Sequence, residues 1–211
     1  MPGNRPYHHG DLRTALVEEA FADLRAGGAD AVSLRAVAAA VGVSPSAAYH
    51  HFSDKEGLLR AVGEEADRLF SSRLMEAAAS VRGDDDASVI ERFRLLGRTY
   101  IAFAADEPAL FRHLFGPLCA PGSEEALASA SQGFAVLLET VDELARRSLL
   151  RSGVREGLEM LAWSSVHGFA LLATEGFLPR HAADQLVSTL LAAVIADPQE
   201  TPIHSTDPER A

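Results

Sequence analysis

Histidines and carboxylates are the side chains of this sequence best suited to acid–base or metal chemistry. The chain has eight His and 30 Asp and Glu residues, but no HExxH, GxSxG or Cys–His pattern and no glycine-rich phosphate loop. His50 and His51 are adjacent, so on a helix they point about 100° apart, and no third metal ligand has a useful spacing. The sequence therefore predicts no enzyme, no metal site and no cofactor.

Cys119 is the single cysteine, which excludes an internal disulfide framework and a cysteine-rich zinc module. We interpret it as a packing residue. No apolar run approaches the roughly 20 residues that span a bilayer, and the first residues lack the apolar segment of a signal peptide. We therefore expect a cytoplasmic protein without membrane contact.

The net charge of −11 is unfavourable for binding nucleic acid, because Lys and Arg supply most non-specific affinity for phosphates. The charge is unevenly distributed. Residues 1–60 contain six basic and seven acidic side chains, so −10 of the −11 lies in the rest of the chain. The N-terminal part neither forbids nor indicates DNA binding.

Helical periodicity runs through almost the whole chain, and no stretch alternates apolar and polar residues over a strand length. The predicted fold class is therefore all-α, with nine helices. Three form an N-terminal domain of residues 1–55, preceded by a flexible arm at 1–9, and about six form a domain of residues 56–196. The tail at 197–211, with three prolines, is expected to be disordered.

Two short helices with a tight turn are predicted in residues 33–52. The first begins after Ser33 and ends at Gly42, which suits a turn that needs positive φ. Ser44 and Pro45 then provide a cap and a first helical residue for the second helix. Small residues near the crossing allow close approach: Ala38, Ala39, Ala47 and Ala48. This spacing is typical of a helix-turn-helix.

The segments that follow are also predicted as helices. Ser53 and Glu56 form a capping box for a long helix to about Val81. Five further helices are expected at 87–105, 109–116, 124–150, 154–174 and from about Pro179 to Ile195.

Residues 33–59 closely resemble the DNA-binding domain of TetR-family transcriptional regulators, with Ser-Leu-Arg-Ala-Val-Ala at 33–38, Val-Gly-Val-Ser-Pro at 41–45 and Ala-Tyr-His-His-Phe at 48–52. Residues 7–13 are similar to the start of one branch of that family. Residues 163–168, Trp-Ser-Ser-Val-His-Gly, resemble the Trp…His-Gly signature of a C-terminal ligand domain found with such DNA-binding domains.

The resemblance implies which side chains meet double-stranded DNA. Ser44 would meet a phosphate at the start of the recognition helix, the next three residues would face base edges, and Lys55 would contact phosphate. Arg5 could enter the minor groove. The expected DNA-binding residues are Ser33, Arg35, Ser44, Pro45, Ser46, Ala47, Tyr49, His50 and Lys55. Residues 44–51 lack Arg, Asn and Gln, so DNA shape and dimer symmetry must supply much of the specificity. His50 and His51 could instead be surface residues without contacts, and Tyr49 could be a residue at the edge of the core whose hydroxyl binds water.

Four residues of the predicted helix 154–174 recur at i, i+3, i+7 and i+11: Met160, Trp163, His167 and Leu171. Two interpretations stay open, core packing or an apolar pocket for a small-molecule effector. The candidate ligand-binding residues are Phe103, Phe111, Phe115, Phe134, Met160, Trp163, His167 and Leu171.

The last two helices have enough apolar surface for a four-helix homodimer interface, which the resemblance also implies. The residues expected there are Ala170, Leu171, Ala173, Leu186, Leu190, Leu191 and Val194. Such a dimer would place its recognition helices about 34–36 Å apart on a near-palindromic operator. The expected function is a ligand-released repressor. The alternative is a helical ligand- or partner-binding protein with little DNA affinity.

Overall fold

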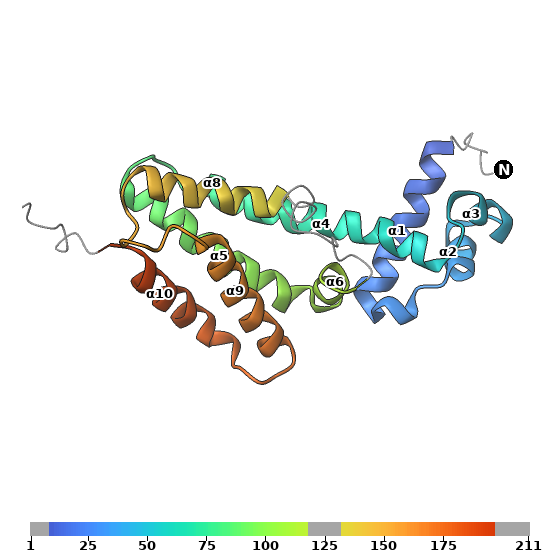
Figure 1. Cartoon of the computed structure of the whole chain (residues 1–211). Helices are drawn as coiled ribbons and strands as arrows, with labels where there is room; N and C mark the ends of the chain where they lie inside the picture. Colours follow the sequence, from blue (N-terminus) through green and yellow to red (C-terminus); the bar gives the residue numbers. More distant parts are fainter. Residues whose placement is uncertain (1–8, 118–131, 197–211) are drawn as a thin grey trace, which may run out of the picture.

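The computed structural model of the chain describes residues 9–117 and 132–196. These residues form nine α-helices, two 3-10 helices and one isolated β-bridge (Figure 1). The predicted all-α fold class is confirmed. Arg5, Cys119 and the tail at 197–211 lie outside the described residues.

The first three α-helices pack together at one end of the elongated molecule (Figure 1). They are α1 (His9–Gly27), α2 (Leu34–Val41) and α3 (Pro45–His51), with the 3-10 helix η1 (Ala29–Ala31) after α1. The buried stripe of α1 recurs every four residues, which is the spacing of one helix face: Leu12, Leu16, Ala20 and Leu24.

Helix α4 (Lys55–Ser80) runs from this end into the rest of the molecule (Figure 1). Its N-cap is Asp54, whose carboxylate accepts a hydrogen bond from the Gly57 amide at 2.7 Å, while Ser53 donates to that carboxylate. The predicted Ser53–Glu56 capping box is wrong by one residue. Asp caps a helix about as well as Ser, so the sequence offered two adjacent caps and the chain uses the second.

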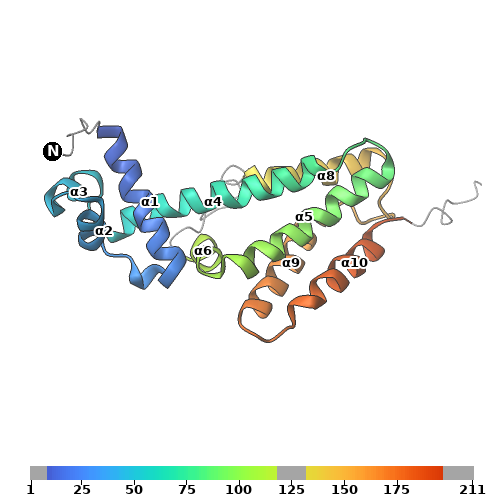
Figure 2. The same ribbon diagram turned by 180° about the vertical axis from the view of Figure 1, so that it is seen from behind.

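Helix α5 lies at the centre of the rest of the molecule. It contacts α4 and each of the α-helices that follow it. Figures 1 and 2 show α4 and α8 on one side of α5, and α9 and α10 on the other. Their bounds are α5 (Asp86–Asp106), α6 (Pro108–Leu114), α8 (Gln132–Arg146), α9 (Leu158–Thr174) and α10 (Ala183–Val194), with the 3-10 helix η2 (Arg180–Ala182) before α10.

Two of these helices are shorter than predicted. Helix α8 ends at Arg146 because Ser148 adopts φ 58°, and Leu150 then pairs with Ile195 in the β-bridge. Helix α9 begins at Leu158, not Val154, because Gly157 precedes it with φ 77°. Both ends therefore depend on left-handed backbone positions that helical periodicity does not report.

Two glycines let the helices around α5 approach closely. A Cβ on Gly97 of α5 would lie 3.3 Å from Val187 of α10, and one on Gly133 of α8 would lie 2.8 Å from Leu74 of α4. The Gly133 amide also donates to the buried Ser71 hydroxyl at 2.9 Å. Among the described residues, no helix is long and apolar enough to cross a membrane.

Candidate functional site

The turn between α2 and α3 has the predicted geometry. Gly42 ends α2 in the left-handed region at φ 81° and ψ 27°, and the Val43 amide donates to the Ala38 carbonyl at 2.9 Å. Ser44 caps α3 by accepting a hydrogen bond from the Ala47 amide at 3.2 Å, with Pro45 as the first helical residue. The turn therefore fixes the direction in which α3 leaves α2.

The crossing of α2 and α3 is held by two small residues. Ala38 and Ala48 are fully buried there, whereas Ala39 is exposed. Phe52 closes the other end of α3, with the Arg13 guanidinium of α1 stacked 5.1 Å from its ring centre. Because Ala48 faces the core, the opposite face of α3 must point outward.

The outward face of α3 carries four of the predicted DNA-binding residues. Pro45, Ser46, Tyr49 and His50 are all exposed, with 44% of Tyr49 open to solvent. These positions follow the spacing of one helix face. The face can offer a hydroxyl, a phenol and an imidazole to a partner. Ala47, also predicted to contact DNA, is half-buried against the core.

Three further predicted residues flank this face. Ser33 precedes α2 with its side chain exposed and making no capping hydrogen bond, and Arg35, two residues later, is also exposed. Lys55 is half-buried on the first turn of α4. Within the described ranges, no three His, Cys, Asp or Glu side chains are placed to hold a metal ion.

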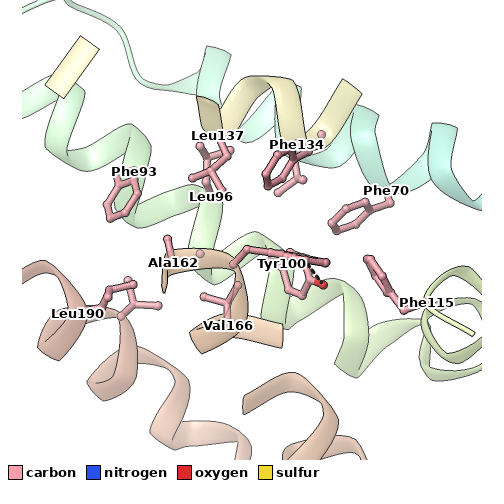
Figure 3. Close-up of a pocket in the computed structure, with 15 residues that line it drawn as sticks. Phe70, Phe93, Leu96, Tyr100, Phe115, Phe134, Leu137, Ala162, Val166 and Leu190 are labelled. Atoms are coloured by element: carbon pink, nitrogen blue, oxygen red, sulfur yellow. Dashed lines mark hydrogen bonds between the residues drawn. The ribbon is translucent and has the colours of Figure 1, made fainter. Parts of the chain in front are cut away.

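A second feature is a cavity of about 70 Å³ between α4, α5, α8, α9 and α10 (Figure 3). Its walls are mainly aromatic and aliphatic, and none of its described lining residues is charged. The lining residues are Phe70, Leu74, Phe93, Leu96, Gly97, Tyr100, Phe115, Gly133, Phe134, Leu137, Ala162, Trp163, Val166, Val187 and Leu190. A few polar groups in an apolar cavity are typical of small-molecule sites.

The polar edge of the cavity is a hydrogen-bonded group of three side chains. The Tyr100 hydroxyl lies 2.7 Å from Nδ1 of His167, and Trp163 Nε1 donates to the same hydroxyl at 3.3 Å. The rings of Phe111 and Phe115 pack against Tyr100 and His167 with centroids 5.0–5.9 Å apart, and against each other at 4.9 Å. The three hydrogen-bonded side chains therefore join α5 to α9, and the ring of Phe111 adds α6.

Burial determines the protonation of two of these groups. It raises the pKa of the Tyr100 phenol, so the hydroxyl keeps its proton. It lowers the pKa of His167 below its usual value of 6.5, so the imidazole is neutral at pH 7. The polar edge therefore carries no net charge at neutral pH.

Only some of the predicted ligand-binding residues reach the cavity. Phe115, Phe134 and Trp163 line the cavity, and His167 reaches its edge through Tyr100. Phe103 and Phe111 are fully buried in the core and are not among the lining residues.

Met160 and Leu171 are exposed on the outside of α9, so the expectation that they line a pocket is corrected. They project roughly 120–140° around the helix from Val166, because each residue turns a helix by about 100°. Of the four residues in the stripe, therefore, only Trp163 and His167 face the interior.

The sequence alone did not identify Tyr100 and most of the other lining residues as candidate site residues. Phe93, Gly97 and Tyr100 recur at i, i+4 and i+7 on α5, but this spacing is also that of an ordinary core helix. What distinguishes them is that α8 and α10 leave space beside them, which a single sequence does not report.

Helix α6 connects this cavity to α4 and to α1, and α1 packs against both helices of the helix-turn-helix. Glu107, directly before α6 and only 3% exposed, accepts hydrogen bonds from Nε of Arg25 on α1 at 2.6 Å and from Arg73 on α4 at 3.0 Å. Within α6, Nε2 of the buried His113 lies 2.8 Å from the Leu59 carbonyl of α4. Phe115, which follows α6, lines the cavity. Through its own residues and the two that flank it, α6 thus contacts α1, α4 and the cavity.

The outer surface of α9 and the loop after it are apolar. The exposed large residues there are Met160, Leu161, Leu171, Leu172 and Phe177. Of the residues expected in a dimer interface, Leu171 is exposed and Ala173, Leu186 and Leu190 are half-buried. Ala170, Leu191 and Val194 are buried within the chain, so they pack against the chain's own core and this part of the expectation is corrected.

Two family models match the chain. Residues 16–62 match the model described as bacterial regulatory proteins, tetR family, and residues 93–196 match the tetracyclin repressor-like C-terminal domain. The first match covers the helix-turn-helix and the start of α4, and the second covers most of the cavity.

Known proteins resemble the chain over most of its length. It is 28% identical to the nucleoid occlusion factor SlmA of Vibrio vulnificus over 154 residues, which is 72% of this chain and 74% of that protein. Among solved structures, a protein of unknown function from Rhodococcus sp. RHA1 superposes with a TM-score of 0.75 at 27% identity, covering 92% of this chain and all of that one. A TetR family transcription regulator from Marinobacter aquaeolei VT8 shares the fold with a TM-score of 0.64 at 21% identity, covering 89% and 97% of the two chains.

A helix-turn-helix with an exposed second helix, joined to a larger helical domain, defines a class of DNA-binding transcriptional regulators. The two family matches make the assignment specific. The chain belongs to the TetR family of transcriptional regulators.

Proposed function

We propose that the protein is a homodimeric repressor that binds a near-palindromic operator and is released by a small molecule in the cavity. The observation that carries this proposal is the outward face of α3, which is presented by a rigid turn. Residues 1–55 would form the DNA-binding domain and residues 56–196 the effector and dimerisation domain. The ranges of the two family matches support this division.

The proposed DNA contacts follow from exposure and side-chain type. Ser46 and Pro45 face base edges, while Tyr49 and His50 reach the groove edge or the backbone. Ser33, Arg35, Ser44 and Lys55 contact phosphates from either side. Ala47 contributes at most its methyl group, because it is half-buried.

The proposed dimer uses the outer surface of α9 and α10. Exposed leucines on α9 form an apolar surface that a second copy would cover in a four-helix arrangement. A two-fold axis there places the two α3 helices at one end of the assembly. Each chain then reads one half of a symmetric site. Because the two chains are linked, the dimer binds the whole site more tightly than one chain binds a half-site.

The proposed coupling between effector and DNA uses α6. An effector in the cavity presses on Phe115 and shifts α6, whose bonds to Arg25 and Leu59 transmit the shift to α1 and α4. The α3 helices then lose the spacing that fits the operator. By linkage, DNA must weaken effector binding by the same factor.

The experiment selects binding sites from random duplex DNA with the full chain. We expect a two-fold symmetric site with half-sites about one helical turn apart, bound in a strongly salt-dependent manner. Lys55→Ala should lower affinity and reduce the salt slope, whereas Arg180→Ala, which removes an exposed cation on η2, should change neither. Enrichment of no symmetric site at moderate salt would contradict the proposal.

The second candidate is a helical ligand- or partner-binding protein with little DNA affinity. The near-neutral charge of residues 1–60 favours it. It predicts only weak binding with no sequence preference and no effect of Lys55→Ala.

A further inference from the structure

The lining of the cavity is uncharged, although the chain is rich in ionisable groups. Almost a quarter of the residues are charged, yet none lies among the described lining residues. An ionised ligand buried there would lose its hydration without an opposite charge to replace it, which costs several kcal/mol in real proteins. The cavity therefore selects against carboxylates and ammonium groups.

The hydrogen-bonded group at the polar edge leaves one donor unused. If Tyr100 donates to Nδ1 of His167, the neutral imidazole has its proton on Nε2, and no described residue accepts it. If Nδ1 carries the proton and donates to the Tyr100 oxygen, the Tyr100 hydroxyl proton is free instead, since Trp163 can only donate. Only the second arrangement offers a donor to the cavity, because Tyr100 is among its lining residues and His167 is not.

We propose that the effector is a neutral, mainly apolar carbonyl compound whose oxygen accepts a hydrogen bond from the Tyr100 hydroxyl, while His167 donates to that hydroxyl. This inference rests on the proposed role of the cavity as the effector site. The apolar part of the ligand packs among Phe70, Phe93 and Phe134, and its oxygen lies at the end of the cavity where the Tyr100 hydroxyl points toward Phe115 (Figure 3). A carbonyl satisfies the spare donor without adding a donor of its own.

Trp163 makes the inference testable without knowing the natural ligand. It is the only tryptophan of the chain and lines the cavity, so its fluorescence reports occupancy directly. The probes are four compounds of one ring size: cyclohexanone, cyclohexane, cyclohexanecarboxylate and cyclohexylammonium. Quenching of free N-acetyltryptophanamide by each probe is subtracted.

We expect cyclohexanone to bind at least about ten-fold more tightly than either ionised probe at pH 7. Tyr100→Phe should weaken cyclohexanone about 3- to 10-fold, as loss of one hydrogen bond predicts, and should change cyclohexane less than about two-fold. Unchanged cyclohexane binding shows that the variant keeps its cavity.

Three outcomes would overturn the inference. They are equal affinity for an ionised probe, equal loss of the ketone and the hydrocarbon in Tyr100→Phe, and absence of binding by all four probes. The titration contains no DNA, so its failure leaves the DNA-binding proposal standing, and failure to select an operator leaves this inference standing.

Discussion

The outward face of α3 and the cavity behind it differ in how much of the chain is needed to hold them. The α3 face depends on a turn of a few residues, from Gly42 to Ser44, and on contacts with α2 and α1. The cavity depends on five helices that meet only in the folded chain, from Phe70 on α4 to Leu190 on α10. The first is thus a local structure and the second a long-range one, and substitutions should affect them separately.

The largest expected effect is on the long-range region. Phe103 is fully buried and packs 5.0 Å from the Phe70 ring centre, so Phe103→Ala leaves a cavity in the packing around α5. We expect a loss of about 3–5 kcal/mol in the free energy of unfolding, measured by urea denaturation. Phe177→Ala, at a position 76% exposed, should change it by less than about 0.5 kcal/mol. Similar losses in both variants would contradict the packing described for α5.

The next effect concerns the connection between the two regions. Glu107→Gln removes the charge that pairs with Arg25 and Arg73, and we expect a loss of about 1–3 kcal/mol, because Glu107 is buried although Arg25 is not. Glu156→Gln, at an exposed position, is the matched control. A double-mutant cycle with Arg25→Ala should be non-additive. Strict additivity would mean that this ion pair does not join α1 to α6.

A smaller effect is expected in the local region. Gly42→Ala places a side chain at φ 81° and should destabilise the chain by about 1–2 kcal/mol. Gly42→Asn should be milder, because Asn tolerates the left-handed region. DNA affinity should fall in Gly42→Ala while the affinity of cyclohexanone for the cavity stays unchanged. A fall in both would show that the two regions are not separable.

The smallest expected effect is a pH dependence at His167. Burial lowers its pKa in the folded chain, so the unfolded chain binds more protons as the pH falls below about 6.5, and stability decreases. The urea midpoint should therefore drop between pH 7 and pH 5, and His167→Gln should reduce that drop. His181→Gln, on the exposed η2, controls for the loss of a histidine and should leave the drop as in the unchanged chain. An equal drop in His167→Gln would contradict this role.

The difference between the regions also explains what the sequence could predict. Gly42, Ser44 and Pro45 act through backbone geometry within a few residues, so the turn and both short helices were predictable. The error at Ser53 is also local, since two adjacent residues can both cap a helix.

The cavity could be predicted only in part. Phe134 was named from residue type, whereas Met160, Trp163 and Leu171 were named from one helical spacing. That spacing drifts around the helix, so Trp163 lines the cavity while Met160 and Leu171 are exposed. Tyr100 lies in the predicted helix 87–105 but was not a candidate site residue, because its role depends on where α9 places His167. Glu107 falls between the predicted helices 87–105 and 109–116, and its pairing with Arg25, 82 positions away, has no local signal.

The most direct test of the account is the binding of the selected symmetric duplex compared with a duplex that contains one half-site. Fluorescence anisotropy gives the affinities, and sedimentation gives the number of chains bound. We expect two chains on the symmetric duplex and about 100-fold or greater loss of affinity for the half-site at the same salt concentration. Equal affinity for both duplexes, or a single chain on the symmetric one, would contradict a regulator that reads DNA as a dimer through α3.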